Sequence, residues 1–67
     1  MKVFAERLKE LRIDKNLSQR QLAKELGFTQ PAIARWESNS QVPNIEVAKE
    51  IAIYFGVSID YLCGLED

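Results

Sequence analysis

The chain has 67 residues, of which 46% are hydrophobic and 28% are charged, which is the balance of one small globular domain spanning residues 1–67. One cysteine and no histidine leave no intrachain disulfide and no zinc site made of protein ligands. No apolar run approaches the ~18 residues that a membrane span needs, and the first residues lack the apolar core of a signal peptide. These features predict a cytoplasmic domain with no membrane, metal or cofactor partner.

Charge is divided unevenly along the chain. The formal net charge is −1, but residues 1–37 contain eight Lys or Arg and five Asp or Glu, a net charge of +3. Residues 38–67 contain one Lys and five Asp or Glu, a net charge of −4. Because attraction to phosphate depends on the local field more than on the total charge, the basic first half is compatible with nucleic-acid binding.

A first helix is predicted from about residue 2 to residue 15, because Phe4, Leu8 and Leu11 recur at helical spacing. Four further helices each follow a residue of N-cap type, whose side chain accepts a bond from the first turn of a helix. These N-caps are Ser18, Thr29, Asn44 and Ser58. Gln21, three residues after the first of them, completes a capping box.

The second and third helices are joined by a short turn at Gly27, where a left-handed residue is favoured. The inward residues of this pair are apolar: Leu22, Ala23, Leu26, Ile33 and Trp36. We interpret Trp36 as a core residue rather than a base-stacking one, because it lies beside Ile33. The pattern is that of a helix-turn-helix motif over residues 19–38, whose second helix is presented to the DNA major groove.

The fourth helix is predicted to close the bundle. Its inward residues are expected to be Ile45, Ala48, Ile51, Ala52 and Phe55. Gly56 ends this helix, and a short fifth helix runs to about Leu62. No segment has the alternation of a strand. The predicted fold is therefore all-α, a compact bundle of about five short helices that contains a helix-turn-helix.

Three stretches of the chain carry a family pattern: Leu-Ser-Gln-x-x-Leu-Ala-x-x-Leu-Gly at residues 17–27, Ile33 followed by Trp36-Glu37, and Phe-Gly-Val-Ser-Ile-Asp-Tyr-Leu at residues 55–62. The pattern resembles the lambda-repressor-like (Cro/repressor-type) helix-turn-helix family of bacteria and their phages. This resemblance implies a sequence-specific DNA-binding transcriptional regulator, a repressor, which acts on the nucleoid and binds a palindromic operator as a homodimer. The contact between the two copies is expected around Tyr54, Ile59, Tyr61 and Leu65.

In that family the first turns of the third helix contact bases, which assigns base contacts here to Gln30, Pro31, Ala34 and Arg35. Arg35 points away from the apolar stripe, and its guanidinium can donate to O6 and N7 of guanine. Gln30, at the tip of the helix, can pair with N6 and N7 of adenine. Pro31 offers only an apolar contact, and the methyl group of Ala34 can touch a thymine.

Phosphate contacts are expected from two regions. Gln19 begins the second helix, where free N–H groups favour an anion, and Arg20 beside it adds positive charge. In the family the loop after the third helix, residues 38–41, also touches phosphate. This assigns contacts here to Ser38, Asn39 and Ser40. Because the loop contains no Lys or Arg, those contacts should be neutral hydrogen bonds.

Arg12 and Glu37 are predicted to form a partly buried structural ion pair. Arg12 follows Leu8 by four residues and Glu37 follows Ile33 by four, so each charge edges an apolar helical stripe. The family pattern places a pair there too. Removal of one member of such a pair is expected to unfold a domain of this size.

An enzyme is not expected, because the chain has no histidine, no glycine-rich phosphate loop and no carboxylates at metal-ligand spacing. No small-molecule ligand is evident. The alternative to a DNA-binding regulator is a protein-interaction module that uses the same fold, such as an antitoxin or an anti-repressor partner. The acidic second half of the chain would suit that use.

Overall fold

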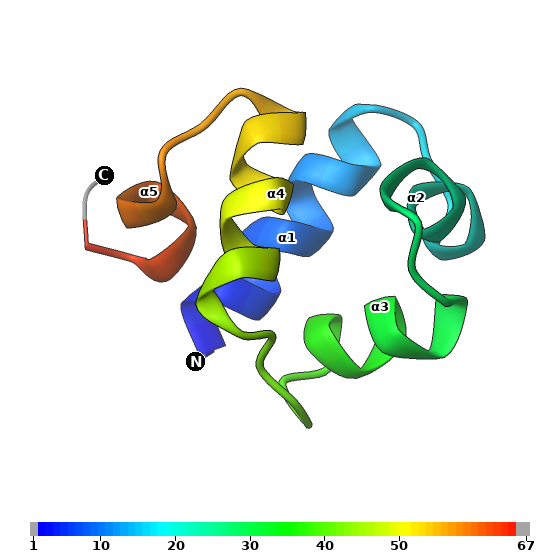
Figure 1. Ribbon diagram of the computed structural model, residues 1–67, viewed down its shortest axis with the longest axis horizontal. Helices are drawn as coiled ribbons and strands as arrows, with labels where there is room; N and C mark the ends of the chain where they lie inside the picture. Colours follow the sequence, from blue (N-terminus) through cyan, green and yellow to red (C-terminus); the bar gives the residue numbers. More distant parts are fainter. Residues whose placement is uncertain (1, 66–67) are drawn as a thin grey trace.

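Five α-helices make up residues 2–65, the part of the chain that the computed structural model describes (Figure 1). In chain order they are α1 (Lys2–Asp14), α2 (Gln19–Leu26), α3 (Gln30–Glu37), α4 (Ile45–Phe55) and α5 (Ile59–Cys63). No strand occurs within these described residues. The all-α prediction is therefore confirmed, and the principal extents of 28 × 23 × 20 Å are those of a small bundle.

Local side-chain chemistry explains where the helices begin. Each of the four predicted N-caps accepts a hydrogen bond from the backbone N–H three residues later: Ser18, Thr29, Asn44 and Ser58. In α2 the cap is reciprocal, because the side chain of Gln21 also accepts from the Ser18 N–H at 2.7 Å. Such caps satisfy N–H groups that the helix itself leaves unpaired. The end of α1 lies at Asp14, one residue before the predicted end, and Asn16 follows in the left-handed region with φ 59°.

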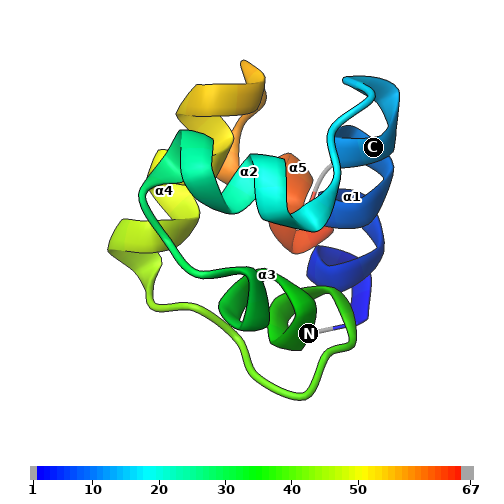
Figure 2. The same cartoon turned by 90° about the vertical axis from the view of Figure 1, so that its right-hand side faces the viewer.

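The helices enclose one core. Figures 1 and 2 show α2 and α3 at one end of the molecule and α5 at the other, with α1 and α4 between them. α1 contacts both α3 and α5, and α4 contacts both α2 and α5. All five helices contribute a fully buried side chain: Phe4, Leu8, Leu22, Ile33, Ile51 and Leu62. The bundle therefore fixes the helix-turn-helix against α1 and α4 rather than leaving it as a separate arm.

Trp36 is a core residue, as predicted. Its side chain is 8% exposed, and its ring meets that of Phe28 edge to face with the centroids 5.3 Å apart. Edge-to-face packing is a favoured aromatic geometry. The indole therefore lies in the core and is not available for stacking on a base.

The expectation that Ile45 faces inward is wrong. Ile45 is 62% exposed, whereas Ala48, Ile51 and Ala52 are buried. Ile45 is the first residue of α4 and lies at the edge of the apolar stripe, so no neighbouring helix reaches far enough to cover it. No helix within residues 2–65 is long and apolar enough to cross a membrane.

Candidate nucleic-acid interface

The helix-turn-helix places α3 at an outer edge of the molecule, below α2 in the view of Figure 2. The turn between them is made at Gly27, which has φ 78° and donates its N–H to the end of α2. The inner face of α3 carries the buried residues Ile33 and Trp36. The opposite face carries exposed Pro31 and Arg35. The predicted base-contacting residues therefore lie on or beside the face that the core does not use.

The structure brings the two predicted partners Arg12 and Glu37 together. Arg12 Nε lies 2.6 Å from Glu37 Oε2, and Arg12 Nη2 donates to Glu37 Oε1 at 3.0 Å. The two side chains are 12% and 3% exposed. Arg12 Nη1 also donates to the carbonyl of Leu17 at 2.7 Å. This bidentate contact holds Glu37, the last residue of α3, against α1 in a defined geometry.

Two further hydrogen bonds extend this pair to the tips of both helices. Gln19 Nε2 donates to Glu37 Oε1 at 3.2 Å, and Gln30 Nε2 donates to Gln19 Oε1 at 2.8 Å. We call Arg12, Glu37, Gln19 and Gln30 the polar network. It runs from α1 to the start of α3 and orients the side chains of both glutamines.

Sequence reasoning missed the two glutamine links of the polar network. A signal was present, since Gln19 and Gln30 are the first residues of α2 and α3. The turn of a helix-turn-helix folds the second of these helices back against the first. Only the packing of the two helices, however, sets the distance between the two amide groups.

Arg35 lies on the exposed side of α3 and is engaged by the loop that follows. Its Nε donates to Gln41 Oε1 at 3.0 Å. The hydroxyls of Ser38 and Ser40 both donate to the Arg35 carbonyl, at 3.1 and 3.3 Å, and the two hydroxyls lie 3.0 Å from each other. Asn39, at the tip, has φ 63°. The three loop residues assigned to phosphate thus form an exposed turn whose hydroxyls also close the end of α3.

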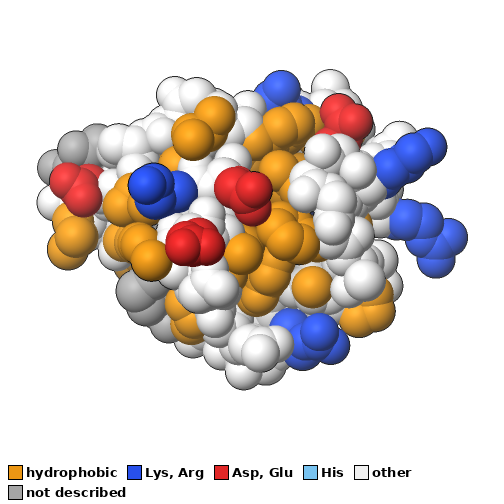
Figure 3. Space-filling view, viewed as in Figure 1, with side chains coloured by type: hydrophobic (Ala, Val, Ile, Leu, Met, Phe, Trp, Pro, Cys, Tyr) orange, Lys and Arg blue, Asp and Glu red, His pale blue; other side chains and the backbone are white. Residues whose placement is uncertain are grey.

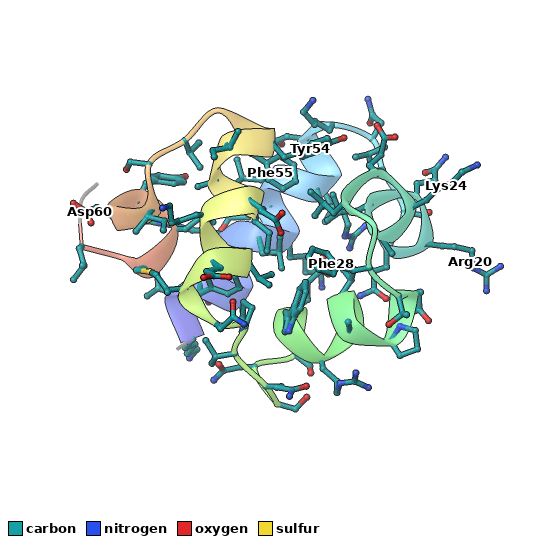
Figure 4. All side chains as sticks on the ribbon, in the orientation of Figure 1. Arg20, Lys24, Phe28, Tyr54, Phe55 and Asp60 are labelled. Carbon is teal, nitrogen blue, oxygen red and sulfur yellow. The ribbon has the colours of Figure 1, made fainter. Side chains whose placement is uncertain are left out.

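Positive charge gathers around this end of the molecule. Arg20 and Lys24 on α2 extend away from the body of the protein (Figure 4). Figure 3 shows Lys and Arg at the rim over α2 and α3, whereas the face over α4 carries acidic and apolar side chains with a basic side chain beside them. Arg20, Lys24 and Arg35 thus put exposed positive charge on the helix-turn-helix, whereas Arg7 of the basic first half lies against Tyr61 of α5.

Of the four residues expected to join two copies, only Leu65 is exposed, at 77%. Tyr54, Ile59 and Tyr61 are half-buried. Tyr54 lies under the Lys15 ammonium, and Tyr61 lies under the guanidinium of Arg7, which also donates to its carbonyl. Both tyrosines therefore already have partners within the chain, and their part in a contact between copies stays a prediction. An apolar residue that the prediction omitted, Ile53 on α4, is 76% exposed.

No group of three or more His, Cys, Asp or Glu that could hold a metal ion occurs within residues 2–65, and no pocket opens in that part of the chain. The candidate surface is therefore made of exposed side chains rather than of a cavity. It consists of an outward helix, the start of α2 and the loop after α3. These features define a helix-turn-helix protein.

Comparison with known proteins agrees with this class. The helix-turn-helix family model matches residues 8–62. The HTH-type transcriptional activator BcrR of Enterococcus faecalis is 45% identical over 64 residues, which are 96% of this chain and 31% of the relative. The uncharacterized HTH-type transcriptional regulator MJ0272 of Methanocaldococcus jannaschii is 38% identical over 61 residues, which are 91% of this chain and 92% of the relative. The cryptic phage CTXphi transcriptional repressor RstR of Vibrio cholerae is 26% identical over 57 residues, 85% of this chain and 51% of the relative.

The chain belongs to the helix-turn-helix family of the lambda repressor/Cro-like type. The relatives it resembles are named as transcriptional regulators. Most of them are longer proteins, and this chain spans between 31% and 58% of the length of the first five.

Proposed function

We propose that this protein is a sequence-specific DNA-binding transcriptional regulator, and that it represses by occupying a palindromic operator as a homodimer. The observation that carries the proposal is the polar network, which ties an outward α3 to the core of the bundle. A recognition helix must enter the major groove in one fixed orientation, because base edges are read by paired hydrogen bonds of defined geometry.

Gln30 supplies the first base contact. One hydrogen of its Nε2 is donated to Gln19, which leaves a second hydrogen and the Oε1 acceptor for a base. An amide in this state can accept from N6 of adenine and donate to N7. Arg35, further along α3, supplies the second contact through its Nη groups to a guanine. Ala34 and Pro31 complete this surface with apolar contacts.

Phosphate is bound by the start of α2 and by the loop after α3. Gln19 lies at a helix N-terminus, where the partial positive charge and backbone N–H groups favour an anion. Arg20 extends from the same turn (Figure 4). Ser38, Asn39 and Ser40 offer neutral polar groups on the other side of α3, and each serine hydroxyl turns from the Arg35 carbonyl to donate to phosphate. This distribution places phosphate contacts on both sides of the recognition helix.

One copy makes few contacts, so a second copy on a symmetric site supplies the remaining affinity. The two recognition helices of such a dimer lie ~34 Å apart, one turn of DNA. Leu65 and Ile53 are the most exposed large apolar side chains among residues 2–65, and they support a contact between copies. Repression follows from occupancy alone, since a bound dimer excludes other proteins from the same DNA. Its place of action is the nucleoid of a bacterial cell.

The experiment begins with selection of binding sites from randomised duplexes, followed by affinity measurements at several salt concentrations. We expect a symmetric motif and an apparent affinity that falls steeply with salt, because each neutralised phosphate releases counterions. Placing the selected site over a promoter should lower reporter output. Absence of DNA binding at low salt would favour a protein-interaction module instead, and a rise in reporter output would identify an activator.

A further inference from the structure

We propose that Gln41 is a specificity-determining residue that acts through Arg35, by holding the guanidinium in position for a guanine. The inference rests on the proposed function, in which Arg35 reads a base. It gives Gln41 a positioning role that is distinct from the phosphate contacts of the loop in which it lies. The reasoning depends on two independent links between the residues, one through side chains and one through the backbone.

The side-chain link fixes which edge of the guanidinium remains available. Arg35 Nε donates to Gln41 Oε1 at 3.0 Å, and Nε carries only one hydrogen. The edge formed by Nε and Nη2 is therefore occupied within the protein. The two Nη groups remain, and together they present a pair of donors end-on. Paired donors of this kind match O6 and N7 of guanine.

The backbone link joins Gln41 to Arg35, the same residue that the Gln41 side chain contacts. The carbonyl of Arg35 accepts from the backbone N–H of Ser40 at 3.1 Å and from that of Gln41 at 3.3 Å. The hydroxyls of Ser38 and Ser40 donate to the same oxygen. Asn39 makes the required turn with φ 63°, a conformation that asparagine adopts more readily than most residues. The loop is thus folded onto Arg35 before any DNA arrives.

A long side chain that is already oriented loses less freedom on binding than one that is not. Immobilising such a side chain at an interface has a free-energy cost, which preorganisation reduces. Loss of Gln41 should therefore lower the preference of Arg35 for its base pair by roughly three- to tenfold. Affinity for duplexes that lack this base pair should not change, because Arg35 makes no specific contact with them.

The test compares affinities of the whole chain for the selected operator and for operators in which the Arg35-dependent base pair is replaced. The variants are Gln41→Ala, Gln41→Glu, Arg35→Ala, Val42→Ala and the double variant Arg35→Ala with Gln41→Ala. Circular dichroism establishes that each is folded. Val42→Ala is the matched control, since it truncates the next exposed residue of the loop.

We expect Gln41→Ala to reduce discrimination at that one base pair, and to have no further effect when Arg35 is already alanine. Gln41→Glu keeps the acceptor oxygen, so it should retain the discrimination while its charge weakens binding to every duplex. Val42→Ala should leave the discrimination unchanged. A uniform loss across all duplexes in Gln41→Ala, or a loss that persists without Arg35, would overturn the positioning role and identify a direct contact with DNA. Unchanged discrimination in Arg35→Ala would overturn both the base-reading role of Arg35 and this inference.

Discussion

Glu37 and Arg12 form an ion pair that is almost wholly removed from water, with Nε and Oε2 2.6 Å apart. The pair joins the end of the recognition helix to the first helix of the bundle. Glu37 also accepts from Gln19, whose own oxygen accepts from Gln30. The same carboxylate therefore serves the stability of the domain and the orientation of the groups proposed to contact DNA.

Glu37→Ala is expected to unfold most of the protein. Removing one member of a buried pair costs about 3–5 kcal/mol, because the remaining charge stays buried without compensation. A domain of this size has a total stability of only about 3–5 kcal/mol. Thermal melts followed by circular dichroism measure the loss. Glu50→Ala, which removes an exposed carboxylate from α4, is the control and should melt close to the wild type. A Glu37→Ala variant as stable as the control would mean that the pair contributes little.

Gln30→Ala and Gln19→Ala should weaken DNA binding in different ways. Truncation of Gln30 removes a proposed base contact, so it should relax selectivity at one base pair by about 1–3 kcal/mol. Truncation of Gln19 removes a proposed phosphate contact, so affinity should fall for all sequences, with a smaller added loss of selectivity at the Gln30 base pair because Gln19 no longer holds that amide. Because the two amides are hydrogen-bonded, the double variant should lose less than the two single effects added together. Full additivity would show that the bond does not couple them.

Much of the fold could be predicted because its determinants are local. Ser18 and Asn44 cap helices through bonds to residues three positions away, and such bonds depend only on nearby sequence. The ion pair could also be anticipated, since both charges edge an apolar stripe. The exposure of Ile45 could not be anticipated, because it depends on how far the neighbouring helices extend past the start of α4.

The finer arrangement of the candidate site depends on contacts between separate elements. The bond between Gln19 and Gln30 requires the relative placement of two helices, which spacing within either helix does not give. The role of Gln41 depends on a turn at Asn39 in the left-handed region, and the sequence marks that turn only weakly. The placement of Tyr54 and Tyr61 beside a cation from α1 or the turn after it also depends on packing between elements, and their expected dimer contact stays a prediction.

Gly64→Ala is expected to destabilise the protein more than Gly56→Ala. Both glycines have left-handed backbone conformations, with φ 80° and 69°, which cost an alanine about 1–2 kcal/mol. A Cβ at Gly56 would meet nothing within 4 Å, whereas one at Gly64 would lie 2.8 Å from Val3 Cγ1. The added crowding against α1 should cost about 1–3 kcal/mol more. Urea unfolding curves measure both losses.

A second substitution separates crowding from backbone strain at Gly64. Val3 is exposed, so Val3→Ala alone should cost little. In the Gly64→Ala background it should instead recover much of the loss that exceeds that of Gly56→Ala, because it removes both Cγ atoms and leaves only the Val3 Cβ, 3.0 Å away. Failure to recover any stability would mean that α5 shifts away from α1 and avoids the contact.

Stability should fall at alkaline pH through Tyr54. Partial removal of its hydroxyl from water, together with the charge and hydrogen bond of Glu25, raises the pKa of Tyr54 above its ordinary value of 10.0. The unfolded chain then releases this proton at lower pH than the folded protein does. The contribution to stability is therefore present below about pH 10 and is lost as the pH rises through the folded pKa.

The titration of Tyr54 can be measured directly. In a Tyr61→Phe background, tyrosinate absorbance reports Tyr54 alone. Glu25→Gln should lower this pKa, while Glu46→Gln, at the opposite end of α4, should leave it unchanged. An equal pKa of Tyr54 in the Glu25→Gln and Glu46→Gln variants would show that Glu25 does not act on Tyr54.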